Sequence, residues 1–127
     1  MARILVVEDH EVNLQLMEEI IKLMGHEPIS ARDGAEGLEL AFSEKPDLIL
    51  MDIQMPGING LEAMRRIKSD PSTSHIPVLA LTAMAMKGDE ERLMGEGFDD
   101  YISKPIRLHD VTEKIRRWLG DVQGADS

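Results

Sequence analysis

The sequence has no cysteine, no long apolar run and few basic residues. Without cysteine the chain forms no disulfide bond and no thiolate metal site. No stretch approaches the roughly 18 apolar residues of a membrane helix, and the opening MARILVVEDHE reaches acidic residues too early for a signal peptide. The 14 Lys and Arg are scattered among 24 Asp and Glu, and the net charge of -10 repels a phosphate backbone. We therefore expect a cytoplasmic protein that binds neither membranes nor nucleic acid.

The composition that remains is that of an ordinary globular domain. Apolar residues make up 43% of the 127 positions and charged residues 30%, values typical of soluble folded proteins. A chain of this length fits one compact domain. We place that domain at residues 1–119 and expect a flexible polar tail, GDVQGADS, at residues 120–127.

Short apolar runs at four places predict β-strands. The strongly apolar runs do not alternate apolar with polar residues. This pattern is typical of strands covered by helices on both faces of a parallel sheet. A fifth candidate, EPIS, is marginal because it is only partly apolar. The four runs span residues 4–7, 48–51, 76–81 and 101–102, and EPIS spans residues 27–30.

Apolar residues at helical spacing fill the gaps between these strands. Val12, Leu16, Ile20 and Met24 predict the first helix, and Gly25 stands where a left-handed cap would end it. The remaining helices are indicated by Ala35, Leu38 and Phe42, by Leu61, Met64 and Ile67, by residues 86–95, and by Leu108, Val111, Ile115 and Leu119. A β-α unit repeated five times predicts an α/β fold, with a doubly wound, five-stranded parallel sheet flanked by five helices.

Polar residues follow the predicted strands at the points where the strands end. Glu8 and Asp9 follow the first strand, Asp52 the third, Thr82 the fourth, and Lys104 comes shortly after the fifth. In an open α/β sheet, ligands bind outside the carboxyl ends of the strands, where the strand order reverses. If the first and third strands are neighbours, these side chains line one pocket.

The expected pocket gathers three carboxylates, which repel one another unless a cation or a proton intervenes. Mg²⁺ prefers oxygen ligands and is usually held by one or two carboxylates together with a phosphate. The metal and the Lys104 ammonium would balance the charge of Glu8, Asp9 and Asp52. A phosphoryl group on Asp52 would add negative charge that Lys104, the Thr82 hydroxyl and backbone N–H groups can share.

Four motifs at strand ends carry a resemblance to a known family. They are VVEDHE at residues 6–11, DLILMDIQMPGING at 47–60, VLALTA at 78–83 and YISKP at 101–105. Over its whole length the chain resembles the receiver domain of two-component response regulators. The stretch TAMAMKGDEE, residues 82–91, is similar to that of a single-domain cell-cycle regulator of this family. The resemblance implies the flavodoxin-like strand order 2-1-3-4-5 and a mainly monomeric signalling protein.

The resemblance also implies the roles of individual acidic residues. Asp52 would accept a phosphoryl group from a histidine kinase or a phosphotransfer protein. Asp9, Asp52 and the backbone carbonyl of Gln54 would ligate Mg²⁺, or Mn²⁺ in its place, and Glu8 would act directly or through water. In this interpretation the protein is a phosphoacceptor that catalyses only its own phosphorylation and dephosphorylation.

Further residues are implicated in the response to phosphorylation. Lys104 would bind a phosphoryl oxygen, and the peptide bond before Pro105 would be cis. Thr82 would move toward the phosphoryl group while Tyr101 turns inward. The altered surface, formed by the fourth helix, the fifth strand and the fifth helix, would bind a downstream protein.

Plainer explanations exist for each residue taken alone. Asp52 could cap the following turn, and a lone lysine such as Lys104 is usually solvated. The conjunction of four motifs in order favours one site over separate structural roles. The histidines lack the paired spacing of zinc ligands, and we expect them at the surface. They are His10, His26, His75 and His109.

Two other functions stay open at this point. A phosphohydrolase of the haloacid dehalogenase type also forms an aspartyl phosphate. Such an enzyme needs a second aspartate two positions beyond the nucleophile, where this chain has Gln54. A receiver cut from a hybrid kinase would carry the same motifs, although an immediate entry into the first strand after Met1 favours a free-standing protein.

Overall fold

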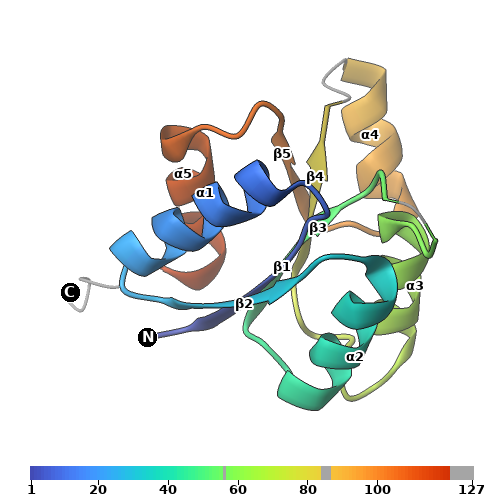
Figure 1. The fold of residues 1–127 in the computed structure, drawn as a ribbon. Coiled ribbons are helices and arrows are strands. Elements are labelled where there is room, and N and C mark those ends of the chain that lie inside the picture. Colours follow the sequence, from blue (N-terminus) through green and yellow to red (C-terminus); the bar gives the residue numbers. More distant parts are fainter. Residues whose placement is uncertain (56, 84–86, 121–127) are drawn as a thin grey trace.

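The computed structural model describes residues 1–55, 57–83 and 87–120. In this part of the chain five strands alternate with five helices (Figure 1). The strands are β1 (Arg3–Val7), β2 (Glu27–Ala31), β3 (Leu48–Asp52), β4 (Val78–Thr82) and β5 (Asp100–Ser103). The helices are α1 (Glu11–Leu23), α2 (Gly34–Glu44), α3 (Gly60–Ser69), α4 (Lys87–Glu96) and α5 (Leu108–Leu119). The β-α repeat predicted from the sequence is confirmed.

The strands form one parallel sheet in the order β2-β1-β3-β4-β5. Helices α1 and α5 cover one face of the sheet, and α2, α3 and α4 cover the other (Figure 1). Every residue of β3 and β4 is buried, because both faces of these central strands pack against helices. The sheet therefore separates two apolar cores, one around Leu50 and Ile115 and the other around Met51 and Met64.

Two strands differ in detail from the sequence pattern. The fourth strand was expected from residue 76, but β4 begins at Val78 because Pro77 has no N–H for the sheet ladder. Ile76 is nevertheless buried, since it packs into the core just before the strand. The marginal EPIS segment does form β2, and its Pro28 is tolerated because β2 is an edge strand.

Two of the four residues in the apolar stripe predicted for the first helix are exposed. Ile20 is buried as predicted, but Val12 is 67% exposed and Leu16 38% exposed, and Leu14 and Met17 are buried against the sheet instead. Both sets have helical spacing, but they lie on different sides of α1. Gly25 follows the helix with a φ of 85°, as expected for a left-handed residue at this end.

The last two helices differ from their predicted patterns at their first residues. Helix α4 begins at Lys87, so Met86, the first residue of the predicted fourth helix, lies outside the described residues, as does the expected tail beyond Gly120. Helix α5 matches its apolar pattern through Val111 and Ile115, although Leu108 is 57% exposed. Among the described residues, no helix combines the length and the apolar character that a membrane span requires.

One of the four histidines is not at the surface. His10, His75 and His109 are exposed, but His26 is buried beneath the start of the sheet. The backbone N–H of Ala2 donates a hydrogen bond to His26 Nδ1 at 2.9 Å, which requires the neutral imidazole. Burial lowers the pKa of His26, and the positive N-terminal amine lowers it further, while Asp47 opposes the shift.

This lowered pKa makes stability depend on pH. Because the unfolded chain binds the proton more readily, the contribution of His26 is complete above its unfolded pKa of about 6.5 and is lost below it. We expect the free energy of unfolding, measured with urea, to fall between about pH 7.5 and pH 5.5. In His26→Gln this part of the slope should disappear, while exposed His75→Gln should keep it. An unchanged slope in His26→Gln would contradict this explanation.

Candidate functional site

The polar residues predicted at strand ends lie at one edge of the sheet, because parallel strands all end there. Glu8 and Asp9 directly follow β1, and Asp52 is the last residue of β3. Thr82 ends β4, and Lys104 follows β5. The backbone N–H of Lys104 donates a hydrogen bond to the Thr82 carbonyl at 2.7 Å, which extends the pairing of the last two strands. Since β1 and β3 are neighbours, the condition for a shared pocket is met.

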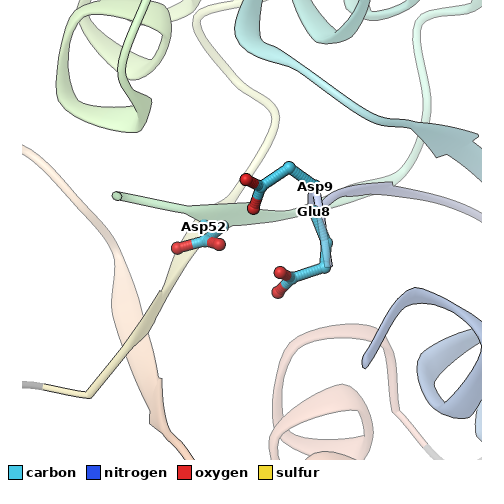
Figure 2. A group of neighbouring side chains, drawn as sticks. All are labelled: Glu8, Asp9 and Asp52. Carbon is cyan, nitrogen blue, oxygen red and sulfur yellow. The ribbon is translucent and has the colours of Figure 1, made fainter. Parts of the chain in front are cut away.

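The carboxylates of Glu8, Asp9 and Asp52 form one cluster. One oxygen of each lies within 4.8 Å of the others. Figure 2 shows the Asp9 side chain extending toward Asp52, with Glu8 beside them. Glu8 is fully buried and Asp52 is 2% exposed, whereas Asp9 is exposed. The cluster therefore has a buried floor and is open to solvent on the side of Asp9.

Lys104 ties the two buried acids together. Its Nζ lies 3.0 Å from Asp52 Oδ2 and 3.2 Å from Glu8 Oε1. The other Asp52 oxygen, Oδ1, accepts a hydrogen bond from the backbone N–H of Gln54 at 3.0 Å. The peptide bond between Lys104 and Pro105 is cis, as the sequence resemblance implies. Both Asp52 oxygens are thus held in fixed directions before any ligand binds.

The electrostatics of the cluster reflect burial and like charge. Burial raises the pKa of Glu8, and the nearby Asp52 carboxylate raises it further. The His10 backbone N–H, which donates to Glu8 Oε2 at 3.1 Å, acts in the opposite direction, as does Lys104. Burial alone would lower the pKa of Lys104, but its contacts with Asp52 and Glu8 outweigh this and raise it. The ammonium is therefore firmly charged and is the counter-ion of both acids.

The residues of this cluster fit a divalent cation. Carboxylate oxygens are ligands that Mg²⁺ prefers, and three of them against one ammonium leave an excess of negative charge when all are ionised. Glu8 Oε1 is buried and, within the described part of the chain, has the ion pair with Lys104 Nζ at 3.2 Å but no hydrogen bond. Leaving such an oxygen unsatisfied costs free energy, which a cation or a water molecule would recover.

The two residues expected to move lie at different depths. Thr82 is 1% exposed and lies one position beyond Leu81, the residue that pairs with Asp52 across β3 and β4. Tyr101 is half-buried on β5 and lies outside the acidic cluster. The Lys114 ammonium lies 4.9 Å from the centre of its ring, and a hydrogen bond with Glu90 raises the pKa of the Tyr101 hydroxyl. Tyr101 is therefore in contact with both α4 and α5.

Sequence reasoning missed a third buried acid, Asp100, beside Tyr101. Its carboxylate accepts hydrogen bonds from Lys114 Nζ at 2.6 Å and from Trp118 Nε1 at 3.0 Å. Burial alone would raise the pKa of Asp100, but these hydrogen bonds outweigh it and lower the pKa. Asp100 thus anchors α5 to β5. An acid directly before the predicted fifth strand was the available signal, but its partners are 14 and 18 positions away in the chain.

The fold and this cluster agree with a single family. Residues 4–116 match the response regulator receiver domain family. The chain therefore belongs to the response regulator receiver family, whose members signal by accepting phosphoryl groups from histidine kinases or phosphotransfer proteins and bind Mg²⁺ in an acidic pocket.

Relatives in this family include the polar-differentiation response regulators DivK of Brucella anthropi and Brucella ovis. Each is 49% identical to this chain over 118 residues, which is 93% of this chain and 96% of the relative. The similarity thus extends over nearly the full length of both proteins. The sequence-based expectation of a receiver similar to a single-domain cell-cycle regulator is confirmed.

Solved structures of receivers are also similar. The receiver domain of the sensor histidine kinase PA1611 from Pseudomonas aeruginosa, solved with magnesium coordinated in its active-site cleft, is 33% identical with a TM-score of 0.85. The comparison covers 94% of this chain and 98% of that domain. The chemotaxis protein CheY4 of Vibrio cholerae is 25% identical with a TM-score of 0.86, over 94% of this chain and 99% of that protein.

Proposed function

We propose that Asp52 is the phosphoryl acceptor of this receiver. The observation that carries the proposal is a nearly buried carboxylate held between Lys104 and two further acids at the carboxyl edge of the sheet. In the transfer, the P–N bond of a phosphohistidine breaks as a P–O bond to an Asp52 oxygen forms. The donor imidazole leaves with the electron pair of the broken bond. The product is an acyl phosphate on the domain, which we place at residues 1–119.

Glu8, Asp9, Asp52 and the backbone carbonyl of Gln54 would hold Mg²⁺, and we extend this to Mn²⁺ as a substitute. A bound divalent cation supplies positive charge that offsets the repulsion between the acceptor carboxylate and the incoming phosphoryl oxygens. Lys104 already donates to Asp52 and is placed to donate to a phosphoryl oxygen after transfer. The magnesium in the PA1611 receiver supports this interpretation.

The output of phosphorylation is a changed protein-binding surface. Thr82 would move toward the new phosphoryl group, and Tyr101 would turn inward from its position against α4 and α5. The surface formed by α4, β5 and α5 would then bind a downstream protein, with exposed Met94 as an adaptable contact. By analogy with the DivK relatives, we propose that this signalling acts in the cell cycle. We also propose that the protein is mainly monomeric and lies in the cytoplasm.

The same site could in principle hydrolyse phosphate esters repeatedly, and Gln54 argues against this. Gln54 follows Asp52 by two positions, where a phosphohydrolase of this chemistry has its general acid. An amide cannot supply that proton. We therefore propose one phosphoryl group per protein, followed by slow self-catalysed loss.

The acceptor assignment predicts the behaviour of Asp52→Asn. This variant should fold, because the two side chains are nearly isosteric, and it should take up no phosphoryl group because its amide is not nucleophilic. Mass spectrometry after incubation with acetyl phosphate and Mg²⁺ measures the uptake. Asp47→Asn, at the opposite edge of the sheet, is the control and should be phosphorylated normally. Phosphorylation of Asp52→Asn at the wild-type level, or many turnovers of a phosphate ester by the wild type, would contradict the proposal.

A protein donor must bring its phosphohistidine to the carboxyl edge, and exposed apolar residues lie near that edge. Val12 in the first turn of α1 is 67% exposed, and Leu108 at the start of α5 is 57% exposed. Both helices begin where the site lies and cover the same face of the sheet (Figure 1). We propose that these side chains are part of the surface that contacts the donor.

Loss of these contacts should slow transfer from a protein donor but not from a small molecule. For the double variant Val12→Ser and Leu108→Ser we expect about a tenfold slower transfer from a histidine phosphotransfer protein that phosphorylates the wild type, since burying two such anchors contributes about 1–2 kcal/mol. Uptake from acetyl phosphate should not change. Leu23→Ser, at the far end of α1 and 78% exposed, is the matched control. Equal slowing with both donors would refute this role.

A further inference from the structure

Helix α3 begins directly against the backbone of Asp52. An ideal Cβ on Gly60, the first residue of α3, would lie 2.3 Å from the Asp52 carbonyl oxygen and 2.7 Å from Ile53 Cα. Real Cβ atoms essentially never approach another heavy atom to less than 3.0 Å. The two atoms belong to the main chain, so they cannot rotate away as a flexible side chain would. Any other residue at position 60 must therefore push the end of β3 and the start of α3 apart.

Glycine at this position is not explained by backbone conformation. Gly60 does not have a positive φ, unlike Gly57 and Gly25. What glycine provides here is the close approach of the start of α3 to the backbone of Asp52 and Ile53. Asn59 caps the same helix by accepting a hydrogen bond from the Glu62 N–H at 2.9 Å.

A second glycine approaches the same loop from another helix. An ideal Cβ on Gly34, the first residue of α2, would lie 2.1 Å from the carbonyl oxygen of Ile58. Gly34 also lacks a positive φ, and Asp33 caps its helix by accepting from the Glu36 N–H. The first turns of α2 and α3 thus contact the two ends of the loop that leads from Asp52 to Gly60.

This loop carries the groups that orient the acceptor. The Gln54 N–H donates to Asp52 Oδ1 at 3.0 Å, and the Ile53 N–H donates to the Leu81 carbonyl at 3.3 Å. The carbonyl of Gln54 is also the ligand assigned to Mg²⁺ in the proposed function. A hydrogen bond weakens steeply when its geometry changes, so a small displacement of this backbone alters both the direction of the Asp52 carboxylate and the metal site.

We propose that Gly34 and Gly60 are positioning residues for phosphoryl uptake: by having no Cβ, they let α2 and α3 hold the backbone after Asp52 where Gln54 can orient the acceptor. The inference rests on the proposed function of Asp52. Neither glycine touches the phosphoryl group. Both act through the main-chain atoms of Asp52, Ile53 and Ile58.

The chain offers a matched control for simple overcrowding. An ideal Cβ on Gly37 would lie 2.8 Å from a methyl carbon of the Val7 side chain, also too close. That contact lies in the core between α2 and β1 and involves a side chain, not the backbone of the site loop. Gly95, with open space around its Cβ position, controls for the change from glycine to alanine itself.

The experiment compares Gly60→Ala and Gly34→Ala with Gly37→Ala and Gly95→Ala. We expect the first two to fold, to take up phosphate from acetyl phosphate at least tenfold more slowly, and to bind Mg²⁺ more weakly by calorimetry. In the metal-free proteins, the NMR amide proton of Gln54 should move upfield as its hydrogen bond to Asp52 lengthens. Gly37→Ala should lose stability to urea without these changes, and Gly95→Ala should match the wild type in phosphoryl uptake and Mg²⁺ affinity.

The outcomes separate this inference from the proposed function. A wild-type protein that takes up no phosphoryl group defeats the proposed function itself. If the wild type is active, normal uptake and Mg²⁺ affinity in Gly60→Ala and Gly34→Ala overturn the inference. Equal slowing in Gly37→Ala at the same loss of stability would also overturn it. So would failure of both site variants to fold, since the glycines would then serve the fold alone.

Discussion

The site depends on two nearly buried carboxylates, Glu8 and Asp52, that lie beside each other. Glu8 is fully buried and Asp52 is 2% exposed, and burial together with the neighbouring charge raises the pKa of Glu8. Their ion-pair partner within the described residues is Lys104. Burying like charges costs free energy, which the two apolar cores on either side of the sheet offset. The same balance makes the site responsive, because an added cation or phosphoryl group changes which charges are paired.

Much of the fold could be predicted from the sequence because the signals were local. The buried run that became β3 needed only its own residues to be recognised, and so did the stripe of α5. The face of α1 could not be predicted in the same way. Val12 and Leu16 have the spacing of a buried stripe, yet Leu14 and Met17 are the buried residues. Which of two apolar sides meets the sheet is decided by packing against β1, β2 and α5, which no local pattern contains.

Part of the acidic site could also be predicted, because its residues lie at the ends of predicted strands. Acids and a lysine at the ends of parallel strands must share an edge once β1 and β3 are neighbours, so Asp52 and Lys104 could be paired in advance. The tertiary contacts around the site could not be predicted from the sequence. Burial of His26, the partners of Asp100 and the approach of Gly60 to the Asp52 carbonyl each join residues that are distant in sequence or meet only through the backbone.

The proposed cation site consists of three acids at two neighbouring strand ends, and one of these acids is the acceptor Asp52. A titration of the unphosphorylated protein with Mg²⁺, followed by the NMR shifts of backbone amides, tests this most directly. We predict saturable shifts with one common midpoint, concentrated at residues 8–10, 52–54 and 104. Weak shifts spread over the acidic surface, with no saturation at this edge of the sheet, would contradict it.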